Sequence, residues 1–248
     1  KKIVYSTLQY LLFNGIIRRA DPDKNFGSPI FPVLRKDGKI RILVDMRNVN
    51  KSLLRPITNS LVDAITQVRE IASNAKFISS IDLSNMFYSF KFADKVIDSG
   101  YANVITPWGA FVMLRAITGS SAVPSYANSE VFHNLHLTKE GKHDFLSNVV
   151  NFFDDTTLYS SEWEGLDVHV DKLCKVIERF SHMGFMINLS KCKLCIDSFS
   201  TPITILGYNI YRNQLSVPLN KYKTLVDCIS VPRTVKDLQR ILGTLNFF

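Results

Sequence analysis

The stretch that most constrains this chain runs from Val149 to Tyr159, where two adjacent aspartates interrupt an otherwise apolar, aromatic and β-branched run. The flanking residues favour β-strands, and Asp-Asp between them favours the turn of a tight hairpin. Buried strands on both sides would hold Asp154 and Asp155 at the edge of the core, where their charges repel each other. A hard cation such as Mg²⁺ relieves that repulsion. A lone Asp-Asp pair is more often a solvated turn than a metal site, so the choice between the two depends on the rest of the sequence.

Composition points to an ordinary folded protein, because 46% of the 248 residues are hydrophobic and 21% are charged. No apolar run reaches the roughly 18 residues of a membrane span, and the sequence begins without a signal-peptide pattern. We therefore expect no membrane partner. Four cysteines at irregular spacing suggest reduced thiols and hence an intracellular setting. Cys192 and Cys195 have the spacing of half a zinc site, but no second pair follows, which favours two ordinary buried thiols.

The net charge of +8 is distributed unevenly along the chain. Residues 1–60 hold twelve basic and four acidic side chains, residues 61–171 hold seven and fourteen, and residues 172–248 hold eleven and four. Basic flanks suit a polyanion, and an acidic centre suits a site that collects carboxylates around a metal. The pattern favours nucleic acid over a membrane surface as the partner.

Alternating strand and helix signals predict an α+β fold. Asp37-Gly38 between the apolar runs 30–34 and 40–44 predicts a hairpin with a basic tip. The spacing of apolar residues predicts further helices and strands. The helices cover residues 4–14, 61–75, 122–135 and 165–182, and the strands cover residues 77–83, 193–199 and 203–210. Pro232 separates two terminal helices, and a capping box formed by Thr234 and Asp237 begins the second.

Asp82 offers a third carboxylate. It ends the predicted strand 77–83 and precedes a helix-prone aromatic stretch, although a lone aspartate at this place is usually a cap or turn residue. If the strand lies beside the Asp154–Asp155 hairpin, three carboxylates converge. Such a cluster suits two Mg²⁺ ions about 4 Å apart that serve the in-line attack of a 3′-hydroxyl on a triphosphate.

The order of several motifs resembles the reverse transcriptases of gypsy-type LTR retrotransposons and retroviruses, over nearly the whole chain. The motifs are Gly15-Ile16-Ile17-Arg18, Ser28-Pro29-Ile30, Lys36-Asp37-Gly38-Lys39-Ile40-Arg41, Val44-Asp45-Met46-Arg47 with Asn50-Lys51, Ile81-Asp82-Leu83 with Phe87, Gly119 with Pro124, Phe152-Phe153-Asp154-Asp155, Lys191-Cys192, Leu206-Gly207-Tyr208, and Leu242-Gly243 with Asn246-Phe247-Phe248. The resemblance implies a right-hand polymerase fold, with an antiparallel palm sheet backed by helices. Residues 1–75 would be fingers-like, 76–210 the palm with an interleaved fingers segment at about 92–118, and 211–248 the start of the thumb.

The activity implied by the resemblance is RNA-directed DNA synthesis, also on DNA templates, in which a DNA primer is extended with dNTPs. Asp82, Asp154 and Asp155 match the family's catalytic triad, which binds two Mg²⁺ ions and can accept Mn²⁺, with the carbonyl of Leu83 as a further metal ligand. Lys191 matches the lysine that donates a proton to the leaving pyrophosphate. An ordinary surface lysine explains Lys191 equally well.

Further residues match substrate contacts of the family. Lys36 and Arg41 lie at the basic hairpin that grips the triphosphate, for which the alternative is a solvated hairpin tip. Phe87 matches the aromatic gate that excludes a 2′-hydroxyl, for which the alternative is a core aromatic. Thr118 lies beside the template-contacting segment. Leu206, Gly207 and Tyr208 match the primer-grip hairpin, which places the primer terminus.

Three positions depart from the family pattern. Phe152 stands where the family usually has tyrosine, Thr118 lies in Ile-Thr-Gly where relatives have Pro-Phe-Gly or Pro-Gln-Gly, and Ala122-Val123-Pro124 replaces Asn-Ala-Pro. All three candidate metal-binding aspartates are nevertheless present. The sequence therefore favours a domain that is competent for catalysis.

As part of a retroelement polyprotein, the chain is expected to adjoin RNase H, protease and integrase segments. Its expected place is a cytoplasmic virus-like particle or the nucleus. Two other functions stay open. One is a domesticated reverse-transcriptase-like domain that binds nucleic acid without catalysis, and the other is a different palm polymerase, such as an RNA-templated RNA polymerase. Phe87 disfavours the latter because an aromatic gate should block ribonucleotides.

Overall fold

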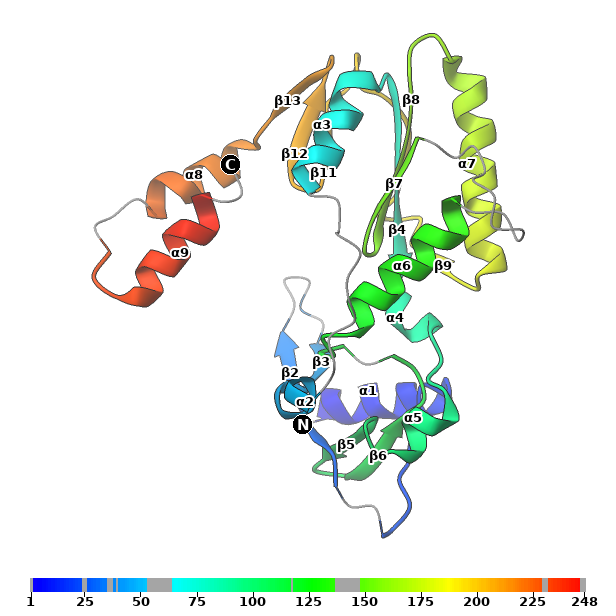
Figure 1. The fold of residues 1–248 in the computed structure, drawn as a ribbon, viewed down its shortest axis with the longest axis vertical. Helices are drawn as coiled ribbons and strands as arrows, with labels where there is room; N and C mark the ends of the chain where they lie inside the picture. The colour runs from blue at the N-terminus through cyan, green and yellow to red at the C-terminus, as the bar shows by residue number, and fades with distance from the viewer. Residues whose placement is uncertain are drawn as a thin grey trace. The chain divides into compact units, whose positions relative to one another are not determined.

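The computed structural model describes residues 2–23, 26–34, 38, 40–52, 64–116, 118–136, 148–228 and 232–245. The chain divides into two compact units, each assembled from segments that are distant in sequence (Figure 1). Unit 1 comprises residues 1–60, 83–145 and 177–188, and unit 2 comprises residues 61–82, 146–176 and 189–248. Both units combine sheets with helices, which confirms the predicted α+β class.

Unit 1 contains a mixed sheet whose described strands follow the order β1-β6-β5-β2-β3. Their bounds are β1 Ile17–Arg19, β2 Ser28–Leu34, β3 Ile40–Val44, β5 Asn103–Thr106 and β6 Gly109–Met113. β2 and β3 form the predicted antiparallel hairpin, with Leu34 opposite Ile40. β2 runs parallel to β5, whereas the other pairings in this sheet are antiparallel. Most of the predicted basic tip, residues 35–37 and 39, lies outside the described residues.

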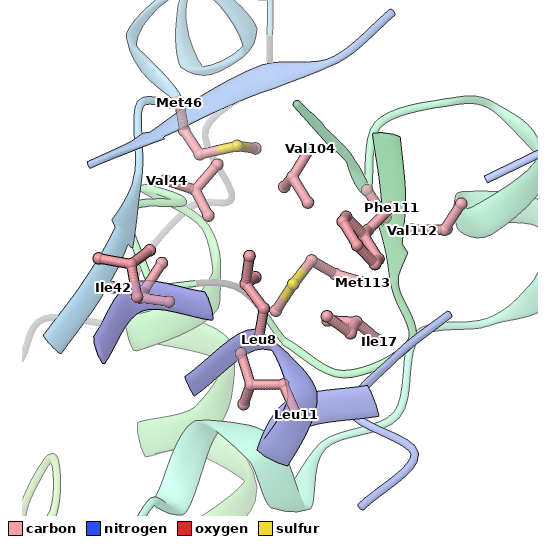
Figure 2. Close-up of a cluster of buried hydrophobic side chains, with 12 residues drawn as sticks. Leu8, Leu11, Ile17, Ile42, Val44, Met46, Val104, Phe111, Val112 and Met113 are labelled. Carbon is pink, nitrogen blue, oxygen red and sulfur yellow. The ribbon is translucent and has the colours of Figure 1, made fainter. Parts of the chain in front are cut away.

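Helix α1, Lys2–Phe13, contributes to the buried cluster beside this sheet. Leu8 and Leu11 are spaced three residues apart and therefore lie on one helix face. Figure 2 shows them grouped with Ile17 and Met113, which come from strands β1 and β6. The helix ends at Phe13, one residue before the predicted end at Asn14, and Gly15 follows with a φ of 63° that glycine readily adopts.

The remaining described elements of unit 1 are mostly helical. They are α2 Arg47–Ser52, α4 Met86–Ser89, α5 Asp94–Asp98, α6 Val123–His136, the last turns of α7 Gly165–His182, and strand β9 Met186–Ile187. Phe90, which follows α4, packs edge-to-face against Tyr126 of α6 at 5.9 Å and against Phe185, just before β9, at 5.6 Å. Such aromatic pairs are worth about 0.5–1.5 kcal/mol beyond their buried area.

Unit 2 is organised around a sheet whose described strands follow the order β10-β4-β8-β7. Their bounds are β4 Phe77–Ser84, β7 Val149–Phe152, β8 Asp155–Ser160 and β10 Lys193–Asp197. β4 is central, and it pairs with β8 from Phe77 opposite Ser160 onward. β8 is buried along its length except at its first residue, Asp155, which is exposed. The sheet therefore presents polar groups at one end of a buried strand.

A second sheet and helix α3, Ala64–Asn74, complete the core of unit 2. The sheet contains β11 Ile203–Ile205, β12 Tyr208–Tyr211 and β13 Gln214–Ser216. Ile71 of α3, Ile78 of β4 and Ile210 of β12 are fully buried in one cluster. The prediction of a single strand over 203–210 is wrong, because the chain reverses at Leu206 and Gly207, which both adopt positive φ.

Helices α8, Leu219–Cys228, and α9, Val235–Leu245, follow the sheets and flank Pro232 as predicted. The capping box is confirmed, since the Thr234 N–H donates to Asp237 Oδ2 at 3.0 Å and the Asp237 N–H donates to Thr234 Oγ1 at 3.1 Å. The bounds of the two compact units differ from the ranges predicted for fingers, palm and thumb. Those three ranges remain a prediction.

Candidate active site

Strand pairing in unit 2 places Asp82 beside Asp155. The β4–β8 ladder ends with these two residues directly opposite each other. Directly opposed residues of an antiparallel pair have Cβ atoms about 4.5–5.5 Å apart. The strand that carries Asp82 therefore lies beside the aspartate hairpin, which is the condition on which the predicted convergence of three carboxylates depended.

Asp154 lies in the turn between β7 and β8. Because Phe152 pairs with Asp155, only Phe153 and Asp154 connect the strands. Phe153 adopts a left-handed φ of 57°, which is uncommon for a bulky residue. Its ring packs against that of Phe152, with 4.9 Å between centroids. The expectation that both aspartates form the turn is corrected, since strand pairing extends one residue further and makes Asp155 the first residue of β8.

A buried polar pair stabilises the hairpin next to this turn. Asn151 and Thr156 are directly opposed, and the Thr156 hydroxyl donates to Asn151 Oδ1 at 2.7 Å. Both side chains are buried, and loss of this hydrogen bond should cost about 0.5–1.5 kcal/mol. The pair thereby holds the register that sets Asp155 at the strand end.

The electrostatics of the site reflect the grouping of its carboxylates. Partial burial raises the pKa of Asp155 above its ordinary value, and the negative charges of Asp154 and Asp82 raise it further. Lys191 acts in the opposite direction. Asp154 and Asp82 thus lie close enough to Asp155 for their charges to disfavour its ionisation. A bound cation would relieve this repulsion.

Lys191 lies at the same site. Its Nζ donates to both carboxylate oxygens of Asp82, at 3.0 and 3.1 Å. The neighbouring Cys192 Sγ accepts a hydrogen bond from the Asp82 N–H at 3.5 Å. The segment before β10 therefore contacts Asp82 through two consecutive residues. The predicted proximity of Lys191 to the aspartates agrees with this geometry, whereas its role as a proton donor remains a prediction.

The chemistry of these donors suits a hard divalent cation, since carboxylate oxygens are preferred by Mg²⁺ and Mn²⁺. Within the described residues, no three His, Cys, Asp or Glu side chains converge tightly enough to hold one ion as they stand. Asp82 directs both oxygens to Lys191 instead. The residue types and the mutual repulsion fit the metal, and Asp82 would have to exchange its ammonium partner for it.

Three further described residues were predicted to contact triphosphate, sugar or metal, and one of them, Leu83, directly follows Asp82 on β4. Arg41 is exposed on β3, Leu83 is buried near the end of β4, and Phe87 is half-buried in the short helix α4. All three belong to unit 1. Lys36 lies outside the described residues. Their contacts with substrates remain predictions.

Thr118 belongs to a segment of unit 1 that Asn50 anchors. The Thr118 carbonyl accepts a hydrogen bond from the Val44 N–H at 3.4 Å. Asn50 Nδ2 donates to the Gly119 carbonyl at 2.9 Å, and Asn50 Oδ1 accepts from the Ser121 N–H at 3.0 Å. The sequence marked Asn50 as part of the motif from Val44 to Lys51 that resembles the fingers entry, but it predicted no contact for this side chain.

A pocket of about 660 Å³ adjoins this anchored segment in unit 1. Its lining is polar and carries both charges; the residues are Asp45, Arg47, Asn48, Asn50, Lys51 and Ser121. Arg47 Nη2 lies 2.6 Å from Asp45 Oδ2, and this bond lowers the pKa of Asp45 to about 2. The pocket therefore offers exposed cationic groups beside the Thr118 segment.

The predicted primer-grip residues form the turn between β11 and β12. Leu206 and Gly207 have φ values of 47° and 87°, and Ile205 pairs with Tyr208 across the turn. Positive φ at both central residues is typical of a tight type I′ hairpin. Tyr208 is buried in the core of unit 2, so its side chain also has a packing role. The hairpin is confirmed, and its function in gripping a primer remains a prediction.

Comparison with known proteins identifies the family. Residues 33–210, which include Asp82, Asp154, Asp155 and Lys191, match the family model of the reverse transcriptase (RNA-dependent DNA polymerase). This match covers most of the chain. The chain belongs to the reverse transcriptase family.

Relatives of this reverse transcriptase domain are polyproteins of viruses and transposons. The chain is 26% identical to the Pro-Pol polyprotein of simian foamy virus type 3 (strain LK3), over 100% of this chain and 20% of that protein. It is 24% identical to the Tf2-3 transposon polyprotein of Schizosaccharomyces pombe (strain 972 / ATCC 24843), over 95% of this chain and 16% of that protein. The chain thus spans about a fifth of these relatives or less.

Solved structures support the same fold. A foamy viral protease–reverse transcriptase in complex with double-stranded DNA matches with a TM-score of 0.81 and 23% identity, covering 100% of this chain and 40% of that one. A foamy viral protease–reverse transcriptase in complex with an RNA/DNA hybrid matches with a TM-score of 0.76 and 23% identity, covering 100% and 30%. In the part of the reverse transcriptase domain that the structure describes, no helix is long and apolar enough to cross a membrane.

Proposed function

We propose that this chain is the polymerase domain of a retroelement Pol polyprotein, and that it extends a DNA primer with dNTPs on an RNA or DNA template by two-metal phosphoryl transfer. The observation that carries the proposal is the opposition of Asp82 and Asp155, with Asp154 in the adjoining turn. Membership of the reverse transcriptase family supports it. Reverse transcriptases generally use divalent metal ions.

Each residue of the unit 2 site has a proposed role. Asp82, Asp154 and Asp155 would bind two Mg²⁺ ions, or Mn²⁺ in their place. The carbonyl of Leu83, the residue that follows Asp82 on β4, is the proposed additional ligand. These ions, when bound, would supply positive charge to the attacking 3′-hydroxyl and to the triphosphate. Lys191, already beside Asp82, would donate a proton to the leaving pyrophosphate.

The substrate contacts are proposed from the matching motifs. Lys36 and Arg41 would bind the triphosphate, Phe87 would exclude a 2′-hydroxyl, and Thr118 would lie near the template. The turn of Leu206, Gly207 and Tyr208 would hold the primer end. The basic flanks of the chain support a nucleic-acid partner, because Lys and Arg neutralise phosphates. The foamy viral neighbours solved with double-stranded DNA and with an RNA/DNA hybrid are consistent with this choice.

The context is proposed from the relatives, which are polyproteins. RNase H, protease and integrase segments would adjoin this chain, and it would work in a cytoplasmic virus-like particle or in the nucleus. Residues 1–75 would serve as fingers, residues 76–210 as the palm with a fingers segment at about 92–118, and residues 211–248 as the beginning of the thumb.

Primer extension on an RNA template with Mg²⁺ tests the function. Asp154→Asn removes one charge from an exposed position, so extension should be lost while the fold survives. Asp171→Asn is a matched control, because it removes the same charge from an exposed position on α7 of unit 2. The control should retain full extension. Circular dichroism and thermal melting of both variants verify that each is folded.

The same experiment separates the alternatives. An unchanged rate in Asp154→Asn would refute the proposed metal site. A wild-type chain that binds a primer–template but never extends it would favour a domesticated, non-catalytic domain. Preferential incorporation of ribonucleotides would favour an RNA-templated RNA polymerase and would reverse the assignment of Phe87.

A further inference from the structure

Strand β10 contains a bulge directly opposite Ser79. Lys193 pairs with Ser80, but Ile196 pairs with Ile78, so two residues of β10 occupy the space opposite Ser79 alone. Those residues are Leu194 and Cys195. Cys195 adopts a left-handed φ of 53°, which residues other than glycine rarely adopt unless other contacts stabilise it. Bulges add one residue to one strand and shift the register beyond them.

A buried hydrogen-bond network supports this bulge. The Cys195 N–H donates to Ser79 Oγ at 2.9 Å, and Ser79 Oγ lies 2.8 Å from His169 Nε2. His169 Nδ1 lies 3.0 Å from Ser160 Oγ. All three side chains have no exposed surface. A neutral imidazole satisfies the network when it accepts from the Ser79 hydroxyl and donates to the Ser160 hydroxyl.

The bulge determines which residue lies level with Asp82. Counting back from the pairing of Lys193 with Ser80 puts Lys191 opposite Asp82, and the ammonium of Lys191 indeed contacts both oxygens of that carboxylate. Without the bulge, the register set by Ile196 opposite Ile78 would continue along β10, and Cys192 would lie opposite Asp82 instead of Lys191. A one-residue slip also turns each side chain to the other face of the sheet.

We propose that His169 and Ser79 are positioning residues for Lys191, because they hold the bulged amide of Cys195 and thereby the register that delivers Lys191 to Asp82. His169 does not touch the proposed reacting groups and acts through Ser79 and β10. The inference rests on the proposed function in so far as Lys191 takes part in nucleotide transfer.

Two serine variants form a matched pair for the test. Ser79 and Ser160 are both fully buried, and both hydrogen-bond the same imidazole, but only Ser79 contacts the Cys195 amide. Ser79→Ala should speed hydrogen exchange of the Cys195 amide and lower the turnover number of primer extension by about tenfold or more, with little change in the dNTP KM. Ser160→Ala should leave both quantities near their wild-type values while lowering the melting temperature.

Histidine variants provide a second route in case Ser79→Ala does not fold. The amide of His169→Gln can reach toward Ser79, whereas the amide of His169→Asn can reach only toward Ser160. Protection of the Cys195 amide and the turnover number should therefore be retained better by Gln than by Asn. Equal loss in both variants would overturn the proposal.

A double-mutant cycle with Lys191 tests the route of action. If Ser79 acts through Lys191, Ser79→Ala should slow extension in the wild-type background but add little to Lys191→Ala. Equal slowing in both backgrounds would overturn the inference. Loss of the proposed function is a distinct result, because an Asp154→Asn variant as active as the wild type would refute the metal site, whereas Cys195 exchange would still report on the network.

Discussion

Asp82 and Asp155 occupy directly opposed positions on two adjacent antiparallel strands, β4 and β8. Like charges in this arrangement destabilise a sheet. The raised pKa of Asp155 is consistent with that cost, because burial and the charges of Asp154 and Asp82 all disfavour its ionised form. A protein optimised only for stability would not keep three carboxylates here, so the repulsion itself argues for a functional site.

Asp155→Asn is expected to stabilise the protein slightly while abolishing primer extension. Because the pKa of Asp155 is raised on folding, the free energy of unfolding of the wild type should fall as the pH rises above the ordinary pKa of an aspartate. The variant lacks this charge, so its advantage in stability should be largest at neutral pH. Solvent reaches this side chain, and the gain should stay below about 1 kcal/mol. Urea denaturation at pH 7 measures it, with Asp171→Asn as the charge-matched control. A clear loss of stability would contradict the explanation.

His169 should make the protein acid-sensitive. Burial lowers its pKa to about 4, with Lys172 adding to the shift and Glu164 opposing it. In the unfolded chain the imidazole of His169 takes up a proton near pH 6.5, whereas in the folded chain it stays neutral down to about pH 4. The free energy of unfolding should therefore fall as the pH drops from about 6.5 to about 4.

The difference between the pKa of His169 in the unfolded and folded chain corresponds to a loss of about 3 kcal/mol in the free energy of unfolding. Denaturation curves across this pH range measure it. His169→Gln keeps a polar side chain but cannot titrate, so its stability should vary much less over the same window. Parallel curves for wild type and variant would show that another group causes the acid sensitivity.

Phe87→Val should weaken discrimination against ribonucleotides. Removing a large ring from the proposed gate leaves room for a 2′-hydroxyl, and steric discrimination of this kind is worth about 10–200-fold. Single-nucleotide incorporation of dNTP and rNTP measures the ratio of kcat/KM. Phe92→Val is a suitable control, since Phe92 is also a partly buried aromatic in unit 1 but packs against Tyr101. An unchanged ratio in Phe87→Val would assign that residue to the core alone.

Asn50→Ala should destabilise the Thr118 segment of unit 1. It removes two hydrogen bonds, to the Gly119 carbonyl and from the Ser121 N–H, and should cost about 1–3 kcal/mol. Asn48→Ala is the control, because Asn48 is exposed and lines the same pocket. Thermal unfolding separates the two variants. Equal melting temperatures would show that the two bonds contribute nothing net.

Gly119 cannot be replaced without moving the same segment. A Cβ atom at this position would lie 2.4 Å from the Val44 carbonyl oxygen, and the φ of Gly119 is 117°. Gly119→Ala should therefore destabilise by more than about 1 kcal/mol. Gly38→Ala offers a comparison, since Gly38 also has a positive φ but its Cβ would meet open space. The difference between their unfolding free energies isolates the steric contribution.

Local signals predicted much of the fold. Apolar spacing predicted helix α7 with its observed bounds, Gly165–His182, and the capping box of Thr234 and Asp237 marked the start of α9. Asp-Gly predicted the β2–β3 hairpin. These features depend on residues that are neighbours in sequence, so a single chain contains the information needed to find them.

The structure differs from the predictions where backbone geometry is unusual. Leu206 and Cys195 adopt positive φ although neither is glycine, and no sequence rule marks such a residue in advance. Leu206 contributes to the turn that divides the expected strand 203–210, and Cys195 creates the bulge in β10. The bond between His169 and Ser79 joins residues 90 positions apart, which no local pattern can reveal.

The two-residue connection between β7 and β8 restricts how this site can vary in evolution. Phe152 can stand in for tyrosine without changing the number of residues between Asn151 and Thr156, which bond across the hairpin. One inserted residue would either break that bond or rotate Asp155 to the opposite face of the sheet. Divergent members should therefore tolerate exchanges of side chains here while keeping the length of the loop constant.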